Sequence, residues 1–190
     1  MTKNDTIKLI AVIVMAYPSY DKFKDEKHIE ALASMWASLF KDDDAGLVSM
    51  AVRKHISNSK WPPSIAEIRE IMTDIQRPDL LPPDAAWSMV TDALSSQGEY
   101  FHGDLFKLFP PLIARVVKTI GWHNFFDMRR YGNREGMDRM AFMELYKPAY
   151  ERARKDAMLP PALDEAIKRV SPGKIAVGAA LIAAKEKEEL

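Results

Sequence analysis

The stretch that decides this fold lies in the first half of the chain, at Ser59-Lys60-Trp61-Pro62-Pro63-Ser64-Ile65-Ala66-Glu67-Ile68. Its two prolines fix their own φ angles and disfavour helical geometry in the residue that precedes each of them. The serine that follows can cap a new helix, and Glu67 three residues later completes a capping box with Ser64. We predict a helix boundary here, with Trp61 packed back against the new helix as a hydrophobic staple.

The same motif, an apolar residue followed by two prolines, occurs three more times in the chain. The other three copies are Leu81-Pro82-Pro83, Phe109-Pro110-Pro111 and Leu159-Pro160-Pro161. Between these corners, apolar residues recur at helical spacing, and no segment alternates with the period of two that a half-buried strand requires. The sequence therefore predicts an all-α protein, built from blocks of helix that rigid corners separate.

These corners also suggest how the chain divides. We predict an N-terminal helical lobe at residues 1–78, a second helical lobe at 79–158 and a C-terminal helix or tail at 159–190. The connector from Arg77 to Pro83 is short and rich in proline, so it cannot serve as a long flexible linker. The two small lobes are therefore expected to pack together.

Two of the expected helices carry distinctive signals. A helix over about residues 5–16 is expected to begin the first lobe, capped by Asn4 or Asp5. A long helix over about residues 136–157 is expected to end the second lobe. It contains Pro148, which removes one helical hydrogen bond and should kink or split the helix there.

Composition restricts the classes of function. Lysine plus arginine equals aspartate plus glutamate, at 27 each, so the net charge does not favour nucleic acid as a partner. The chain has no cysteine, which excludes disulfides and thiolate chemistry and suits a reducing compartment. The apolar run from Leu9 to Ala16 is far shorter than the ~20 residues that span a bilayer. We predict a soluble, cytoplasmic protein that makes no membrane contact.

Motifs for catalysis and metal binding are missing from the sequence. The four histidines lack the spacing of metal ligands, and Pro172-Gly173-Lys174 lacks the upstream glycine of a P-loop. His55 is expected to lie in or beside the core. Asp42–Asp44 are expected at a helix N-terminus, where carboxylates complement the helix dipole, rather than at a metal. We predict a non-enzymatic protein with no cofactor and no metal.

One basic cluster is a candidate contact for nucleic acid. It contains Arg129, Arg130, Tyr131 and Arg134. Arginines beside a tyrosine can bind phosphate and stack on a base, which would suit a nucleic-acid-binding regulator with a basic loop at 129–134. The simpler alternative is a solvated loop between two helices, and the sequence leaves both open.

The C-terminal segment is a candidate for binding a partner protein. Its apolar residues Ile175, Val177, Leu181 and Ile182 lie among alanines, after Pro172-Gly173. Such a helix can place its apolar side in a groove on another protein. Alternatively, it can dock on the second lobe of its own chain.

The N-terminal third of the chain resembles a known protein family. An apolar first helix ends in Tyr17-Pro18, Trp36 follows near the end of the second helix, and the acidic turn Asp42–Asp44 comes next. Ala51 and His55 lie along the third helix, before the stretch that begins at Lys60-Trp61. Together these features resemble the replicative helicase loader and inhibitor proteins of Gram-positive bacteriophages.

The resemblance implies a small helical accessory protein in DNA replication. It implies binding to a hexameric DnaB-type helicase, which such loaders hold inactive and hand to an origin-bound initiator or to single-stranded DNA. In that family the helicase contact lies beyond the N-terminal lobe, and here that position corresponds to residues 160–190. The second half, with Ala86-Trp87 and Gly121-Trp122, is similar to phage replication proteins.

Overall fold

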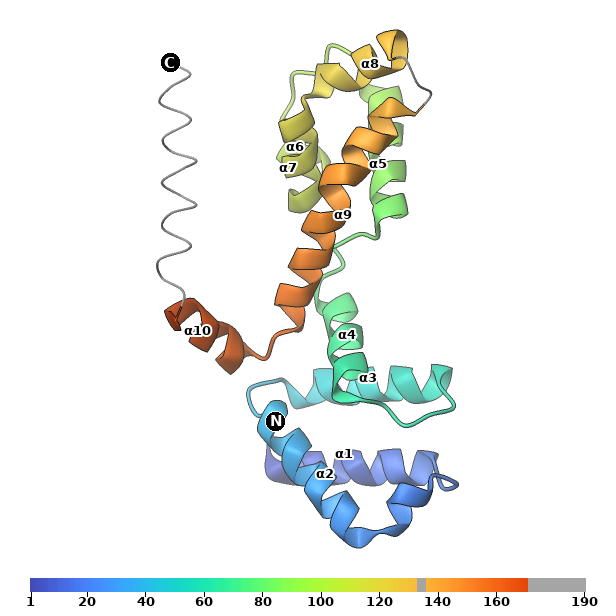
Figure 1. The fold of residues 1–190 in the computed structure, drawn as a ribbon, viewed down its shortest axis with the longest axis vertical. Coiled ribbons are helices and arrows are strands. Elements are labelled where there is room, and N and C mark those ends of the chain that lie inside the picture. The colour runs from blue at the N-terminus through green and yellow to red at the C-terminus, as the bar shows by residue number, and fades with distance from the viewer. Residues whose placement is uncertain (133–135, 171–190) are drawn as a thin grey trace. The chain divides into compact units, whose positions relative to one another are not determined.

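The computed structural model describes residues 1–132 and 136–170 (Figure 1). These residues form ten α-helices and one short 3-10 helix, and no strand occurs among them. The predicted all-α fold is confirmed. Within the same ranges, no helix has both the length and the apolar character needed to cross a membrane.

The chain divides into two compact units. The first contains Met1–Met72 together with the helix near the C-terminus, and the second contains Thr73–Met158. The helices of the first unit are α1 (Lys3–Ala16), η1 (Asp21–Lys24), α2 (Glu26–Leu39), α3 (Ala45–Asn58), the start of α4 (Ile65–Gln76) and α10 (Pro161–Val170). Those of the second are the end of α4, α5 (Pro83–Gln97), α6 (Leu105–Leu108), α7 (Pro111–Ile120), α8 (Trp122–Tyr131) and α9 (Met137–Met158).

Short-range capping explains where the helices of the first unit begin. The cap of α1 is Thr2, so the prediction of Asn4 or Asp5 was wrong. Asp5 instead completes a capping box, because its carboxylate accepts the backbone N–H of Thr2 at 3.1 Å. Asp44 caps α3 by accepting the N–H of Leu47 at 2.8 Å, as expected for a carboxylate at a helix N-terminus.

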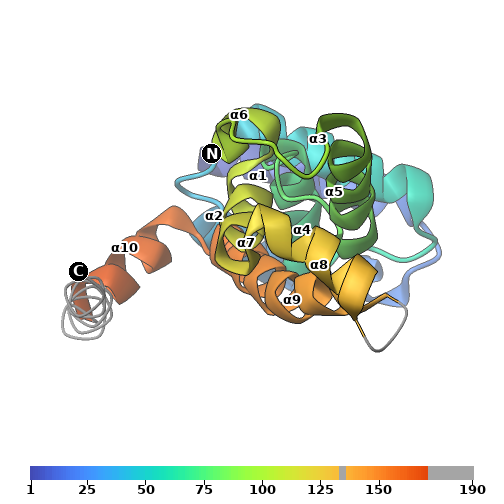
Figure 2. The same cartoon turned by 90° about the horizontal axis from the view of Figure 1, so that it is seen from above.

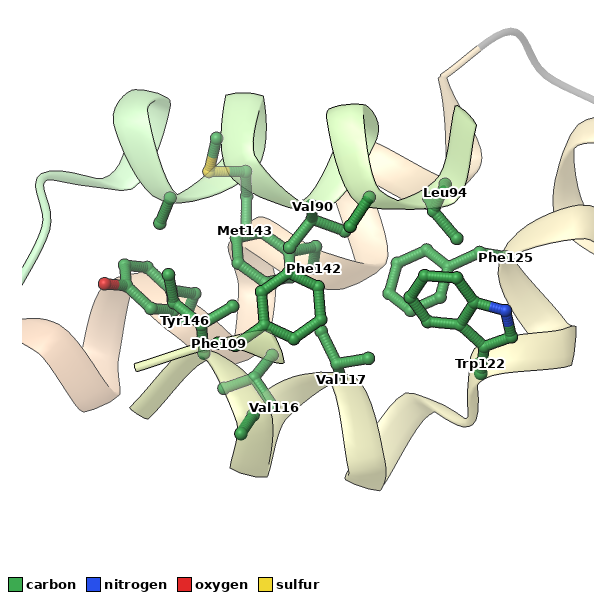
Figure 3. Packing of buried hydrophobic residues seen from close by; sticks show 14 of the residues in the cluster. Val90, Leu94, Phe109, Val116, Val117, Trp122, Phe125, Phe142, Met143 and Tyr146 are labelled. Carbon is green, nitrogen blue, oxygen red and sulfur yellow. The ribbon is translucent and has the colours of Figure 1, made fainter. Parts of the chain in front are cut away.

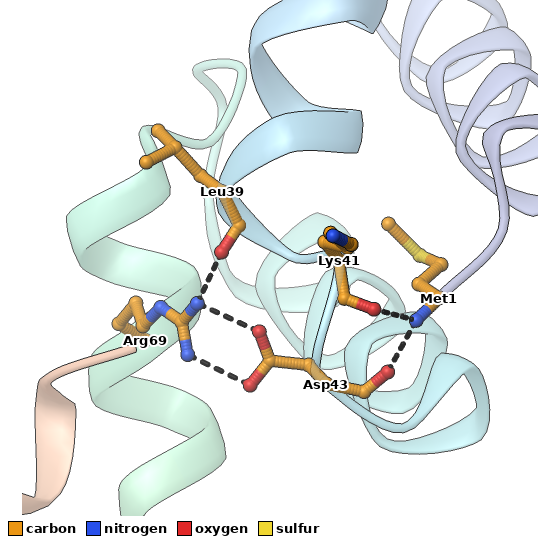
Figure 4. A network of polar contacts seen from close by, with 5 residues as sticks. All are labelled: Met1, Leu39, Lys41, Asp43 and Arg69. Carbon is orange, nitrogen blue, oxygen red and sulfur yellow. Dashed lines mark hydrogen bonds and ion pairs between the residues drawn. The ribbon is translucent and has the colours of Figure 1, made fainter. Parts of the chain in front are cut away.

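The first unit has its own core, in which α1 contacts both α2 and α3. The largest buried side chains there are Trp36 and Phe40, whose ring centroids are 5.2 Å apart. A buried ion pair joins α4 to the turn between α2 and α3 (Figure 4). Arg69 donates two hydrogen bonds to the carboxylate of Asp43, at 2.8 and 2.7 Å, and a third to the carbonyl of Leu39 at 2.6 Å.

The Pro-Pro corners begin helices in two different ways. At the last three corners the second proline is the first residue of its helix, where it loses no hydrogen bond. The carbonyls of the preceding prolines accept the first helical bonds, at 2.9–3.0 Å. At the first corner both prolines precede the cap, and Ser64 takes that position. The apolar residue also differs, since Phe109 is buried whereas Trp61 is exposed.

The second unit is organised around α9, which lies against α5, α7 and α8 (Figures 1 and 2). Its core is rich in aromatic rings, and Phe142 lies near the middle of it (Figure 3). The ring of Phe142 stacks on that of Tyr146 with centroids 5.0 Å apart. The hydroxyl of Tyr146 donates to the carbonyl of Leu81 at 2.7 Å, and burial raises the pKa of Tyr146 above its ordinary value.

The helix α9 continues through Pro148 without a break, so the proline does not split it. Pro148 is exposed while the adjacent turns contribute Tyr146 and Tyr150 to the core. Packing of these two side chains on one face stabilises the helix across the missing hydrogen bond.

Candidate functional site

The corner at Trp61 is held by hydrogen bonds from three different segments. The backbone N–H of Trp61 donates to Ser59 Oγ at 3.1 Å, and the Ser59 hydroxyl donates back to the Trp61 carbonyl at 3.0 Å. His55 Nε2 is 3.0 Å from the same carbonyl oxygen. Because a carbonyl oxygen only accepts hydrogen bonds, Nε2 carries the proton in this contact. The hydroxyl of Tyr17 donates to the Ser59 carbonyl at 3.3 Å.

These contacts explain His55, which is buried as predicted. It serves as a structural residue that ties the end of α3 to the corner.

The predicted capping box at the start of α4 is present. The hydroxyl of Ser64 accepts the backbone N–H of Glu67 at 3.2 Å, and the Glu67 carboxylate accepts the backbone N–H of Ser64 at 2.7 Å. The Ser64 hydroxyl also donates to that carboxylate at 2.7 Å. These bonds from Ser64, first through its side chain and then through its backbone, hold the pKa of Glu67 below its ordinary value.

Replacing Glu67 with glutamine should change how stability depends on pH. Because the folded-state pKa of Glu67 is lowered, its contribution is present above the unfolded value of 4.5 and is lost as pH falls through the folded value. We expect the variant to be about 0.5–1 kcal/mol less stable at pH 7, with a smaller loss between pH 5 and 3 than the wild type. Urea denaturation at each pH measures this. Glu30→Gln, an exposed site in the middle of α2, is the control and should follow the wild type.

The ring of Trp61 does not pack on α4. It is 71% exposed, so the prediction of a hydrophobic staple was wrong. A staple requires an apolar residue immediately before the cap, and Pro63 occupies that position. The bonds to Ser59 and His55 also tie the backbone of Trp61 to the end of α3 rather than to α4.

A cleft of about 380 Å³ lies beside the exposed indole. One wall is the turn after α1 and the other is the corner. Its lining residues are Ala16, Tyr17, Pro18, Ser19, Tyr20, Lys60, Trp61 and Pro62. The lining is therefore aromatic and proline-rich, with Lys60 as its one charged side chain. The cleft, the corner and the capping box form the candidate functional site, to which we refer as the Trp61 site.

Comparison with protein families concerns the same part of the chain. Residues 1–69 match the family model for the N-terminal domain of a helicase loader and inhibitor of Gram-positive phage. The family predicted from the sequence is therefore confirmed over these residues, which include the whole Trp61 site. No curated protein and no solved structure matched the chain.

The predicted nucleic-acid contacts lie in the second unit, at the end of α8. Arg129–Tyr131 form the last helical turn, so the expectation that they lie in a loop was wrong. Arg129 pairs with Asp138 at 2.5 Å, and Arg130 pairs with Glu99 at 2.8 Å while its guanidinium lies 5.7 Å from the Tyr131 ring centroid. Tyr131 itself is 75% exposed.

Two sets of predicted residues are not part of the described chain. Arg134 and the apolar residues of the C-terminal segment, Ile175, Val177, Leu181 and Ile182, lie outside the described residues.

One group of side chains has the composition of a metal site. Glu99, His123 and Asp127 each place a possible ligand atom within 4.8 Å of the others. However, Glu99 is already engaged by the guanidinium of Arg130, and His123 Nε2 lies 3.4 Å from the same carboxylate. The arrangement is explained by these ion pairs, since Arg130 compensates the charge of the carboxylate.

Proposed function

We propose that this chain is a DNA-replication accessory protein that binds a hexameric DnaB-type helicase, inhibits it and loads it at an origin. The observation that carries the proposal is the match of residues 1–69 to the N-terminal domain of a phage helicase loader and inhibitor. An origin-bound initiator or single-stranded DNA would then receive the helicase. The lack of catalytic motifs in the sequence agrees with a role that depends on binding.

The C-terminal segment supplies the helicase contact in this proposal. The resemblance assigns that contact to the region after the N-terminal lobe, and residues 175–182 combine four branched apolar residues with alanines. A helix of this composition can bury its apolar side in a groove of a partner. Its residues Leu181 and Ile182 are the ones to change first.

Mixing the full chain with the replicative helicase of its host tests the proposal. Size-exclusion chromatography with light scattering should give a complex heavier than the helicase hexamer, and helicase-driven unwinding should fall. Leu181→Asp combined with Ile182→Asp should abolish the complex. Met50→Asp, a charge introduced at an exposed apolar position of α3, should retain it.

Two outcomes would count against different parts of the proposal. Separate elution of the two wild-type proteins, both with and without ATP, would contradict helicase binding itself. Full binding by the Leu181/Ile182 double variant would leave helicase binding in place and reject the C-terminal contact.

The alternative of a nucleic-acid-binding regulator has less support. Both Arg129 and Arg130 are paired with carboxylates, so phosphate would have to displace Asp138 and Glu99. Nucleic-acid binding through this turn would be strongly salt-dependent. Gel-shift assays at low salt that show no complex would remove this alternative.

A further inference from the structure

We propose that the Trp61 site binds an extended, proline-bearing peptide segment of a partner protein, with an acidic residue beside the prolines. The cleft lies between Pro18-Ser19-Tyr20 and the corner, and its volume of about 380 Å³ suits a few residues rather than a folded domain. The proposal does not depend on helicase binding, because it rests on this surface alone.

The lining of the cleft matches the chemistry of a polyproline II helix. Proline rings pack on aromatic faces, and proline-rich segments dock in grooves that aromatic residues line. Trp61, Tyr17 and Tyr20 supply such faces, and Pro18 and Pro62 extend them.

The indole of Trp61 adds a directional contact. Its Nε1–H has no hydrogen-bond partner within residues 1–132 and 136–170, and Trp is an obligate donor at that atom. A polyproline II peptide makes no internal hydrogen bonds, so its carbonyl oxygens are free to accept. The donor and acceptor therefore complement each other.

The charge of the cleft selects an acidic neighbour for the prolines. Lys60 is exposed and is the one charged residue in the lining. The nearby acidic groups are already engaged, since Asp21 pairs with Lys24 at 2.7 Å and Glu67 accepts bonds from Ser64. One cation suits one carboxylate. Single-stranded DNA is less suited, because it needs a run of cations along its phosphates.

The corner is also prepared for binding. The Trp61 backbone is already fixed by Ser59, by His55 and by the two prolines that follow it. Ordering this residue on association therefore costs little conformational entropy. An exposed tryptophan on a rigid backbone is the kind of residue that dominates binding energy at interfaces.

Fluorescence anisotropy with a labelled peptide of two glutamates followed by six prolines tests the proposal. We expect saturable binding to the full chain, weakened at least tenfold by Trp61→Ala. Lys60→Glu should weaken this peptide severalfold and should instead favour a peptide with two lysines in place of the glutamates. Neither variant should unfold, since both side chains are exposed, and circular dichroism checks this.

Tyr131→Ala is the matched control, because it removes an equally exposed aromatic ring from the second unit. It should bind the peptide like the wild type. The proposal is overturned if the wild type shows no saturable binding, or if Trp61→Ala binds as tightly as the wild type. Trp61-dependent binding of a labelled fifteen-residue oligothymidine, without peptide binding, would assign the site to single-stranded DNA instead.

Discussion

Replacing Arg69 with methionine should lower the unfolding free energy of the first unit by about 3–5 kcal/mol. The side chains of Arg69 and Asp43 are each only 8% exposed, and the guanidinium makes two bonds to that carboxylate. Methionine keeps most of the apolar volume but leaves the Asp43 carboxylate buried without its cation. The loss is measurable by urea denaturation followed by fluorescence, because Trp36 lies in the same core.

A double-mutant cycle separates the charge from the packing. Asp43→Leu alone should also be strongly destabilising, because it leaves the buried guanidinium without its carboxylate. The double variant should lose much less than the sum of the two, since neither charge then remains buried alone. Additive losses would show that the ion pair contributes nothing as a pair. Arg69→Lys should fall between, because lysine keeps the charge but cannot form the two parallel bonds.

This ion pair shows what sequence analysis does not reach. Arg69 follows the core residue Ile68 in a helix whose apolar face was predicted correctly, but nothing local indicates that the guanidinium is buried. Its partner lies 26 residues earlier, in the acidic turn Asp42–Asp44. The expectation that these aspartates act only at a helix N-terminus therefore holds for Asp44 alone. Pairing over such a distance depends on tertiary packing, which short-range propensity does not describe.

Local chemistry was predictable to a much greater extent. The capping box of Ser64 and Glu67 and the helix starts at the Pro-Pro corners depend on residues within four positions of each other, so the sequence contains all the information. The family of the N-terminal domain was predicted from these same local motifs.

The candidate site was only half predictable. Its stretch was identified, but Trp61 was expected to face α4, and the ring is exposed instead. The direction of the ring is decided by bonds to His55 and by the contact of Tyr17 with Ser59, which spans 42 residues. The cleft that results brings the turn after α1 to the corner, and no pattern within either segment indicates the other.

Replacing Phe142 with alanine should destabilise the second unit by about 3–5 kcal/mol. The ring has no exposed surface, stacks on Tyr146 at 5.0 Å and lies 5.5 Å from the Trp87 ring, with both distances between centroids. Its removal leaves a cavity between α5 and α9 that neighbouring aromatic rings cannot fill without leaving their own positions. Urea denaturation followed by fluorescence and circular dichroism measures the loss, with Trp87 as a direct reporter of the altered packing.

The matched control lies three residues further along the same helix. Leu145 is 41% exposed, so Leu145→Ala has a similar helix propensity and removes an apolar side chain that is already partly in water. We expect it to cost about 1 kcal/mol, since the transfer free energy is small and no cavity forms. Equal losses for the two variants would contradict the central position of Phe142. A larger loss for Phe142→Ala would instead show that stability of this unit depends on the aromatic core that α9 carries, in spite of the proline within that helix.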